Sequence, residues 1–383
     1  MAALEVAGGP GCARFVGGCV RNALLDAPID DIDIATTLKP PAVVTALTAA
    51  GLKAVPTGID HGTVTAISER RPFEVTTLRR DVSTDGRRAT VAFTDDWAED
   101  AARRDFRLNA LYADLDGMIL DPTGEGYDDA LAGRIVFVGE PRARIREDYL
   151  RILRFYRFLA WYGRGEPDGA AVEACADLAE GVARLSAERV SKELLKLLAA
   201  PDPRAAVRLM ADAGVLAHVI GSEADLRLFD AMIGVAPDPL IRLSALLPAA
   251  PEEVARIAAA LRLSNPQKAR LWAAVAGAAS TTMSDAEARA MIWKDGRQAF
   301  EDRLARAYAA SGDSKAGRRL MALAEGWTPP VMPIGGRDLA LLGIPPGPET
   351  GRIIKAFQER WIADDFPADG HEERLRALIA PPR

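Results

Sequence analysis

The segment FVGGCVRNALLDAPIDDIDIAT, residues 15–36, decides the fold. Its glycine pair, Gly17 and Gly18, predicts a turn ahead of a helix, and the acidic pair Asp31 and Asp33 predicts the start of a strand. Side chains two residues apart on an extended strand leave the same face, about 6.5–7 Å apart along the backbone. The two carboxylates are therefore candidates for sharing metal ions.

Oxygen ligands of this kind suit Mg²⁺. Two such ions about 3.5–4 Å apart would activate a 3′-hydroxyl and stabilise a pyrophosphate leaving group. We therefore expect two Mg²⁺ ions at Asp31 and Asp33. The glycine pair would let backbone amides approach a phosphate, and Arg21 adds a guanidinium donor one helical turn later. For an isolated DxD pair, the favoured interpretation of Asp30, Asp31 and Asp33 is that of surface turn residues beside a strand, and only the surrounding motifs reverse this.

Other single residues carry less information. Glu74, in PFEVTTLRR on a further expected strand, is the candidate third acidic group near the metals or the attacking hydroxyl, and its alternative is an exposed strand glutamate. His61 is expected to be structural rather than catalytic. The cysteines Cys12, Cys19 and Cys175 form no CxxC pair, so no structural metal is expected.

Bulk composition sets the class of protein. The 383 residues are enough for two or more cores, and 49% hydrophobic, 27% charged and 6% aromatic residues are typical of a soluble, helix-rich globular protein. No apolar run of about 18 residues and no signal-like amino terminus occur, which predicts a cytoplasmic location and no membrane partner. A net charge of −6 argues against indiscriminate nucleic-acid binding but allows a local basic stripe.

The chain changes character along its length. Short β-rich runs alternate with turns up to about Val138, and from Arg142 onward apolar residues recur every three or four positions, which predicts helices. The predicted fold class is α+β: a small head with a mixed or antiparallel sheet and helices, then an all-α remainder. The expected strands are Asp31–Ala35, Gly62–Ile67, Phe73–Leu78, Thr90–Phe93 and Leu111–Asp114. Expected breaks between helical parts are Ala199–Pro203, Leu263–Pro266 and Trp327–Arg337.

Five ordered segments resemble one family. They are GGCVRNALL with DIDIAT, ARRDFRLNALYAD at 102–114, DPTGEGYDDALAGRIVFVG at 121–139, REDYLRILRFYRF at 146–158, and SAERVSKELLKLL at 186–198. Together they resemble the class II tRNA nucleotidyltransferase and bacterial poly(A) polymerase family, a branch of the polymerase-β-like superfamily, over about half of the chain.

The resemblance implies roles for individual residues. Asp31 and Asp33 would be the metal ligands, and Asp105 would order the RRDF motif. The triphosphate would be contacted by Gly18, Arg21 and Arg104. The segment REDYLRILRFYRF would be a helix that selects the incoming nucleotide through an EDxxR signature, here Glu147, Asp148 and Arg151.

Nucleotide selection also has a physical basis. A carboxylate accepts the exocyclic amine of cytosine or adenine and an arginine donates to a ring acceptor, so CTP and ATP fit while UTP and GTP do not. Asp148, Arg151 and Arg154 would be neighbours on a helix, with Arg157 rotated about half a turn from Asp148. All four are therefore predicted to contact the nucleotide. The alternative for an Arg-rich helix is a solvated charged face.

Two further stretches bear on the substrate. The polar segment Arg79–Phe93 stands where relatives carry a flexible loop linked to the change from cytidine to adenosine addition, and Gly336–Phe357 resembles a tail that grips the tRNA elbow. Three residues depart from the family pattern, Asn22 for aspartate, Asp26 for glycine and Arg107 for threonine, which leaves hydroxyl activation and loop placement open.

The predicted activity is template-independent addition of CCA to the 3′ end of tRNA from CTP and ATP. The alternatives are a poly(A) polymerase, a specialised A-adding or CC-adding enzyme, and an inactive RNA-binding protein. Poly(A) polymerases usually carry a basic extension, whereas this acidic chain ends at HEERLRALIAPPR. The partners expected are CTP, ATP and the 3′ end, acceptor stem and elbow of tRNA, and no protein partner is indicated. The predicted domains are a catalytic head at 1–140, a neck at 141–200, a body at 201–265 and a tRNA-binding tail at 266–383.

Overall fold

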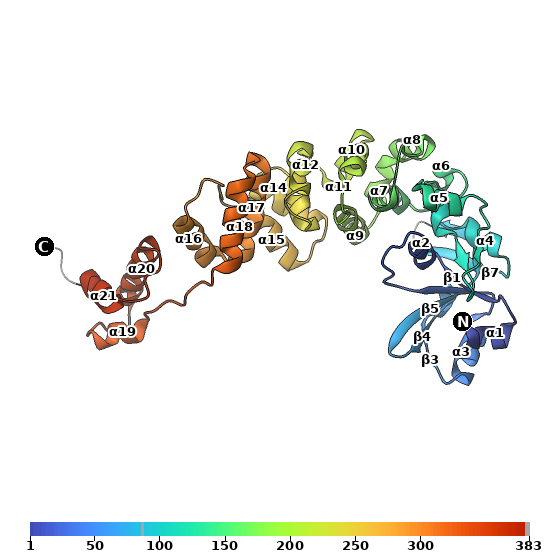
Figure 1. Ribbon diagram of the computed structural model, residues 1–383, viewed down its shortest axis with the longest axis horizontal. Coiled ribbons are helices and arrows are strands. Elements are labelled where there is room, and N and C mark those ends of the chain that lie inside the picture. Colours follow the sequence, from blue (N-terminus) through green and yellow to red (C-terminus); the bar gives the residue numbers. More distant parts are fainter. Residues whose placement is uncertain (86–87, 380–383) are drawn as a thin grey trace. The chain divides into compact units, whose positions relative to one another are not determined.

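The computed structural model describes residues 1–85 and 88–379. The chain forms two compact units, Met1–Ala224 and Asp225–Arg383, whose elements Figure 1 traces along the sequence. Gly86 and Arg87, which fall within the polar stretch Arg79–Phe93, lie outside the described residues.

A seven-stranded mixed sheet forms the head of the first unit, in the order β3-β4-β5-β2-β1-β8-β9. Strands β2 and β5 run parallel, and the other neighbouring pairs run antiparallel. The strands are β1 Ala13–Val16, β2 Asp33–Thr36, β3 Lys53–Gly58, β4 Thr63–Ser68, β5 Arg71–Thr77, β8 Tyr112–Ala113 and β9 Ile119–Leu120. A separate hairpin pairs β6 Arg79–Asp85 with β7 Arg88–Phe93. The predicted mixed-sheet head is confirmed.

The two faces of the sheet are separated by the alternation of side chains along its strands. Ile34 and Val75 point into a core that they share with α1 (Ala2–Gly8) and α3 (Pro40–Ala49). Ala35, the next residue on β2, belongs to the core on the opposite face. This alternation fixes which strand residues remain for a site.

Helices cover the sheet and then continue as the rest of the first unit (Figure 1). Those of the head are α2 Gly18–Leu24, α4 Trp97–Ala102 and α5 Gly126–Ala132, with short 3₁₀ turns η1 Ile59–His61 and η2 Arg107–Asn109. Those that follow are α6 Pro141–Glu147, α7 Leu150–Tyr162, α8 Gly169–Asp177, η3 Ala179–Arg184, α9 Ala187–Leu198, α10 Arg204–Asp212 and α11 Val215–Ile220. On α7 the apolar face supplies buried residues such as Phe155 and Tyr156, so this helix is a core element of the unit.

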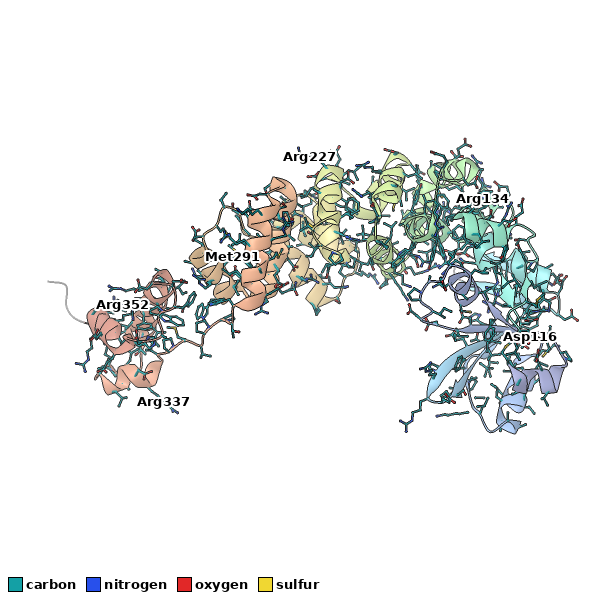
Figure 2. All side chains as sticks on the ribbon, in the orientation of Figure 1. Asp116, Arg134, Arg227, Met291, Arg337 and Arg352 are labelled. Carbon is teal, nitrogen blue, oxygen red and sulfur yellow. The ribbon has the colours of Figure 1, made fainter. Side chains whose placement is uncertain are left out.

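The described part of the second unit is helical. Its helices are α12 Leu226–Ile233, α13 Pro239–Leu246, α14 Pro251–Ala260, α15 Asn265–Val275, α16 Asp285–Asp295, α17 Arg297–Ser311, α18 Ser314–Gly326, α19 Gly336–Leu341, α20 Pro348–Ala363 and α21 His371–Ile379. The helix start predicted at Leu263–Pro266 is confirmed, because Ser264 and Gln267 form a capping box at the beginning of α15. Figure 2 shows side chains on this unit, including the exposed Arg337 on α19 and Arg352 on α20.

The expected strands correspond to β2, β4, β5, β7 and β8, with ends that differ by a few residues. Four strands were missed, including β3, an edge strand that contains Pro56, a residue that cannot donate to a ladder. Within the described residues, no helix is long and apolar enough to cross a membrane.

Candidate active site

Two carboxylates stand side by side on neighbouring parallel strands. Asp33 opens β2 and pairs in register with Glu74 on β5. Strands are about 4.7–4.9 Å apart, and residues in register point to the same side of the sheet. Because the next residues, Ile34 and Val75, point into the α1–α3 core, Asp33 and Glu74 leave the opposite face. Both residues reach solvent there, although neighbouring atoms partly cover Asp33.

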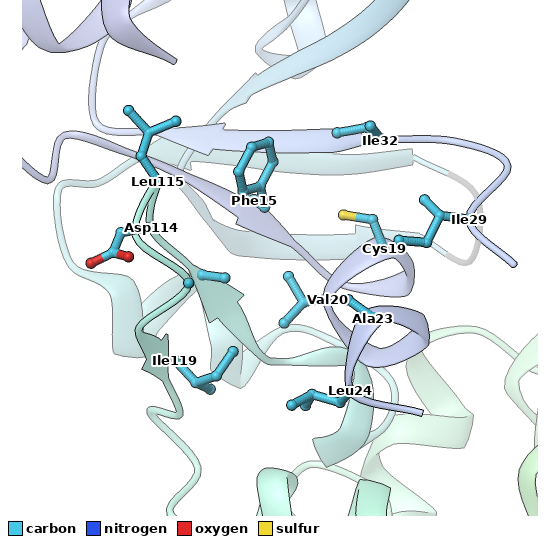
Figure 3. Close-up of a pocket in the computed structure, with 12 residues that line it drawn as sticks. Phe15, Cys19, Val20, Ala23, Leu24, Ile29, Ile32, Asp114, Leu115 and Ile119 are labelled. Carbon is cyan, nitrogen blue, oxygen red and sulfur yellow. The ribbon is translucent and has the colours of Figure 1, made fainter. Parts of the chain in front are cut away.

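Asp31 joins this pair from the segment that leads into β2. The residue between the two aspartates, Ile32, lines an apolar cavity of about 390 Å³ together with Phe15 and Cys19 (Figure 3). Partial burial raises the pKa of Asp33, the charges of Glu74 and Asp31 raise it further, and Arg104 opposes them. The charges of Glu74 and Asp31 thus both act on Asp33 at this edge. The sharing of metal ions by Asp31 and Asp33 stays a prediction.

The donor set suits a hard divalent cation, since it consists of carboxylate oxygens whose mutual repulsion a cation would relieve. In residues 1–85 and 88–379, however, no three His, Cys, Asp or Glu side chains stand close enough to complete a metal site by themselves. Mg²⁺ is commonly held by one or two carboxylates together with substrate phosphates and water. The residues therefore fit magnesium that is bound jointly with a nucleotide.

The glycine turn brings the backbone close to Arg104. Gly17 has a φ of 74°, a left-handed conformation that glycine adopts without strain, and a Cβ there would lie 3.5 Å from Arg104 Nη1. Gly18 then begins α2. Arg104 Nη2 donates to Asp100 at 3.0 Å, and no hydrogen bond to the described residues uses Nη1. That nitrogen therefore remains available for a phosphate beside the turn.

Arg21 is enclosed instead of open to a ligand. It is 6% exposed, and its guanidinium carbon lies 4.0 Å from the ring centre of Tyr162. It donates to the side chains of Asn109, Asn22 and Tyr162. These bonds occupy four of its five N–H groups. Its predicted contact with a triphosphate can use only the remaining one unless these partners rearrange.

Asp105 ties the RRDF motif to α7. Burial alone would raise the pKa of Asp105, but the ion pair with Arg154 and the hydrogen bond from Asn109 outweigh it and lower that pKa. Asn109 in turn accepts from Arg21. A continuous polar chain therefore runs from Arg154 through Asp105 and Asn109 to Arg21, which agrees with the ordering role that the resemblance implied for Asp105.

The predicted nucleotide-selecting helix is corrected at its start. Asp148 is not helical, because its backbone is extended (φ −154°, ψ 107°) between α6 and α7. Its Oδ1 accepts from the Leu150 backbone at 3.1 Å, and its Oδ2 accepts from Arg189 at 2.6 Å. The spacing of three residues from Asp148 to Arg151 therefore does not place them on one helix face. Asp148 lies two residues before the helix that carries Arg151 and accepts from the backbone N–H of its first residue.

Arg151 and Arg157 are also held by carboxylates. Arg151 pairs with Glu147 at 2.5 Å and donates to the carbonyl of Arg103 at 3.2 Å. Arg157 pairs with Glu193 on α9 at 2.6 Å. Each oxygen of Asp148 and two N–H groups of Arg151 keep hydrogen-bonding capacity for a base.

Four residues of this network were missed from the sequence: Asn109, Tyr162, Arg189 and Glu193. Arg189 and Glu193 stand four apart in the quoted segment SAERVSKELLKLL, so a one-turn spacing opposite the charges of α7 was the available signal. Tyr162 gave no signal, since an aromatic residue at the end of an apolar helix is typical of a core.

The departures from the family pattern have local explanations. Asn22 Nδ2 donates to the carbonyl of Pro28 at 2.6 Å, a bond that a carboxylate could not make. Asp26 has a φ of 54°, in the left-handed region where glycine is usual and aspartate is tolerated. Arg107 forms ion pairs with Glu125 and Asp129 beside α5. The stretch expected as a loop forms the β6–β7 hairpin, except for Gly86 and Arg87.

Comparisons with known proteins identify the family of the chain. Residues 13–136 match the family described as Poly A polymerase head domain. Residues 166–224 match a probable RNA and SrmB-binding site of polymerase A. The fold and the acidic edge define a nucleotidyltransferase.

Several relatives carry a more specific name. CCA tRNA nucleotidyltransferase 1, mitochondrial, of Mus musculus is 33% identical over 371 residues, which cover 94% of this chain and 85% of the relative. The CCA-adding enzyme of Geobacillus thermodenitrificans is 39% identical over 214 residues, covering 55% of this chain and 51% of the relative. The chain belongs to the class II CCA-adding enzyme and poly(A) polymerase family.

Solved structures extend the likeness to almost the whole chain. The Bacillus stearothermophilus CCA-adding enzyme in complex with CTP is 25% identical with a TM-score of 0.73, over 99% of this chain and 95% of that one. The Thermotoga maritima CCA-adding enzyme complexed with tRNA is 18% identical with a TM-score of 0.70, over 96% of this chain and 90% of that one, a likeness of fold.

Proposed function

We propose that this nucleotidyltransferase adds C, C and A in turn to the 3′ end of tRNA from CTP and ATP, without a nucleic-acid template. The observation that carries the proposal is the position of the segment Arg103–Arg104. Arg104 acts on the charge of Asp33, while the carbonyl of Arg103 accepts from Arg151. Two adjacent residues thus connect the acidic edge with the group proposed to select the base.

In the proposed reaction, the 3′-oxygen of tRNA forms a bond to the α-phosphorus, and the bond from that phosphorus to the bridging oxygen breaks to release pyrophosphate. Asp31 and Asp33 would hold two magnesium ions, with Glu74 as the third carboxylate beside the attacking hydroxyl. When bound, magnesium would lower the pKa of that hydroxyl and offset charge on the leaving group. The triphosphate would be oriented by Gly18, Arg21, Arg104, Arg154 and Arg157.

Asp148 and Arg151 would select the base. The carboxylate would accept the amine of cytosine or adenine, and the guanidinium would donate to the neighbouring ring nitrogen. Uracil and guanine present the opposite groups, so UTP and GTP would leave buried polar atoms unpaired, which costs affinity. The contact of Asp148 with Arg189 supports this role, because it holds the carboxylate in one orientation.

The finer organisation belongs to the same proposal. We assign the head to residues 1–140, the neck to 141–200, the body to 201–265 and the tail to 266–383, with the helical parts contacting the phosphates of the acceptor stem and elbow. We also assign the protein to the cytoplasm, although the relative from Mus musculus is named mitochondrial.

Primer extension tests this function. The substrates are tRNA transcripts that end before CCA, after C or after CC, with CTP and ATP supplied singly and together. Growth that stops at CCA is expected, with no product from Asp31→Ala and blurred nucleotide choice from Asp148→Ala. Long adenosine tails would instead identify a poly(A) polymerase, and CC-only or A-only products a specialised enzyme. No magnesium-dependent product would overturn the enzymatic function.

A further inference from the structure

A second cavity, of about 600 Å³, lies in the first unit beside the segment that leads to the carboxylates. Its lining includes Asp30, the residue before Asp31, together with Arg157 and Trp161 of α7, Arg164 just after α7, and Lys196 of α9. Three cations, the acidic residue Asp30 and the aromatic residues Trp161 and Tyr162 therefore line a space that begins one residue from the acidic edge.

Two of the three cations are not neutralised. Arg157 is paired with Glu193, but among the described residues no ion pair or side-chain hydrogen bond involves the Arg164 guanidinium or the Lys196 ammonium group. Both side chains are exposed. In a chain with a net charge of −6, two cations without an ion-pair partner beside one cavity favour an anionic ligand, even with Asp30 in the same lining.

The position of Arg164 is nevertheless well defined. Its backbone nitrogen donates to the carbonyl of Gly133 at 3.0 Å, and a Cβ on Gly133 would come within 2.8 Å of Arg164 Cγ. Gly133 is the C-cap of α5 and has a φ of 69°, a conformation that glycine adopts without strain. Because it has no side chain, Arg164 can pack directly against its backbone. The base of the side chain is fixed while its charge is available.

Trp161 supplies a different kind of contact. Its indole Nε1 donates to the carbonyl of Lys196 at 2.8 Å, yet the residue remains 44% exposed. An indole held by its N–H and left open to solvent is suited to stacking against a base. Cations beside an aromatic platform are the combination that binds single-stranded nucleic acid, through phosphates and base faces respectively.

We propose that this cavity binds the single-stranded 3′ end of the RNA primer. A base of that strand stacks on Trp161, and its phosphates lie between Arg164 and Lys196, so that the strand continues past Asp30 toward the acidic edge. The assignment rests on the proposed function. The phosphate chemistry alone would also suit a nucleoside triphosphate or pyrophosphate, but those ligands give Trp161 no base to stack in this cavity while the incoming base is read at Asp148.

Steady-state kinetics and direct binding measurements distinguish the RNA primer from a nucleoside triphosphate or pyrophosphate as the ligand of this cavity. The test compares the wild-type chain with Arg164→Ala/Lys196→Ala and with Trp161→Leu and Trp161→Phe, each checked for wild-type thermal unfolding. The matched control, Lys53→Ala/Arg71→Ala, removes the same charge from exposed strand residues outside the cavity. Anisotropy with a labelled single-stranded RNA ending in CC reports binding even if no nucleotide is added.

The double variant should raise the KM for tRNA and the Kd for the RNA about tenfold, with the KM for CTP unchanged. It should also lower the slope of log Kd against log salt by about 1.4, or 0.7 for each lost phosphate contact. Trp161→Leu should weaken RNA binding, and Trp161→Phe should restore it.

Two outcomes would overturn the proposal. A raised KM for CTP with unchanged RNA binding would assign the cavity to the triphosphate. RNA binding by the double variant equal to that of the control would show that the cavity binds no ligand. Failure of the proposed function alone would appear as absent product with these binding differences intact.

Discussion

At the scale of single residues, the acidic edge is determined by strand register. The parallel pairing of β2 with β5 sets Asp33 opposite Glu74, and the apolar residues that follow each of them fix the face on which they stand. Partial burial, together with the charges of Glu74 and Asp31, raises the pKa of Asp33. From the sequence, Glu74 could be either a catalytic residue or an exposed glutamate of a strand. In the structure it lies where its charge acts on Asp33.

Glu74→Gln distinguishes the two roles of this residue. If the carboxylate helps to bind magnesium, the variant should need more Mg²⁺ and its rate should fall about tenfold or more, as when one charged group of a site is lost. Removal of the negative charge should also lower the pKa of Asp33, so the acid limb of the rate profile should move to lower pH. The measurement is initial rate against Mg²⁺ and pH, with Glu69→Gln as an exposed control. Identical profiles for Glu74→Gln and the control would leave Glu74 as a surface residue.

A second residue-scale prediction concerns Asp100, which is 1% exposed and bonded to Arg103, Arg104 and Tyr112. Burial opposes its ionisation, but Arg104 and Arg103 outweigh burial and lower the pKa of Asp100. The ionised carboxylate of Asp100 therefore makes its full contribution to the free energy of unfolding at pH values above the usual aspartate pKa. This contribution is lost as the pH falls through the lowered pKa of Asp100. Asp100→Asn should cost about 3 kcal/mol near neutral pH. The difference in thermal unfolding midpoint between the wild-type chain and Asp100→Asn should narrow as the solution is acidified. A difference that does not change with pH would contradict this prediction.

At the scale of elements, α7 and α9 act as a matched pair. Arg189 and Glu193 on α9 hold Asp148 and Arg157, so two groups proposed to meet the nucleotide take their orientation from one neighbouring helix. Tyr149, beside Asp148, packs where a Cβ on Gly181 would come within 1.9 Å of its ring. A glycine in η3 is therefore needed for the turn between α6 and α7.

Arg189→Ala tests whether α9 positions the base-reading carboxylate. Asp148 would lose one partner and keep only the Leu150 backbone bond, so we expect UTP incorporation to rise relative to CTP while the KM for tRNA stays unchanged. Lys192→Ala, an exposed change on the same helix, serves as the control. An unaltered CTP to UTP ratio, measured in competition on a tRNA ending before CCA, would limit Arg189 to a structural role.

The same elements show what sequence can and cannot predict. The strand that begins at Asp33 was predicted because alternation along a strand is short-range, and the start of α15 was predicted because its capping box is local. The extended backbone at Asp148 was missed, since the charge pattern continues smoothly through residues 146–158 and only the tertiary contact with Arg189 marks the break. The enclosure of Arg21 was missed for the same reason, because Tyr162 is 141 residues away along the chain.

At the scale of the whole molecule, the chain combines an α+β head with a helical remainder in two compact units. The first unit contains every residue proposed for chemistry and base selection, as well as the cavity proposed for the primer end. The second unit contributes helices with their own cores, such as those around Phe300 and Phe357. We propose a division of labour, with chemistry in the first unit and tRNA contacts shared with the second.

The most direct test of the central claim is the single-turnover rate of cytidine addition to full-length tRNA ending before CCA, at saturating Mg²⁺ and CTP. The wild-type chain is compared with Asp33→Asn and with the control Asp116→Asn at an exposed turn position (Figure 2). Asp33→Asn should slow addition about a thousandfold or more, the loss of several kcal/mol of transition-state stabilisation, while tRNA binding is unchanged. Addition at the rate of the control would contradict the assignment of the acidic edge as the catalytic site.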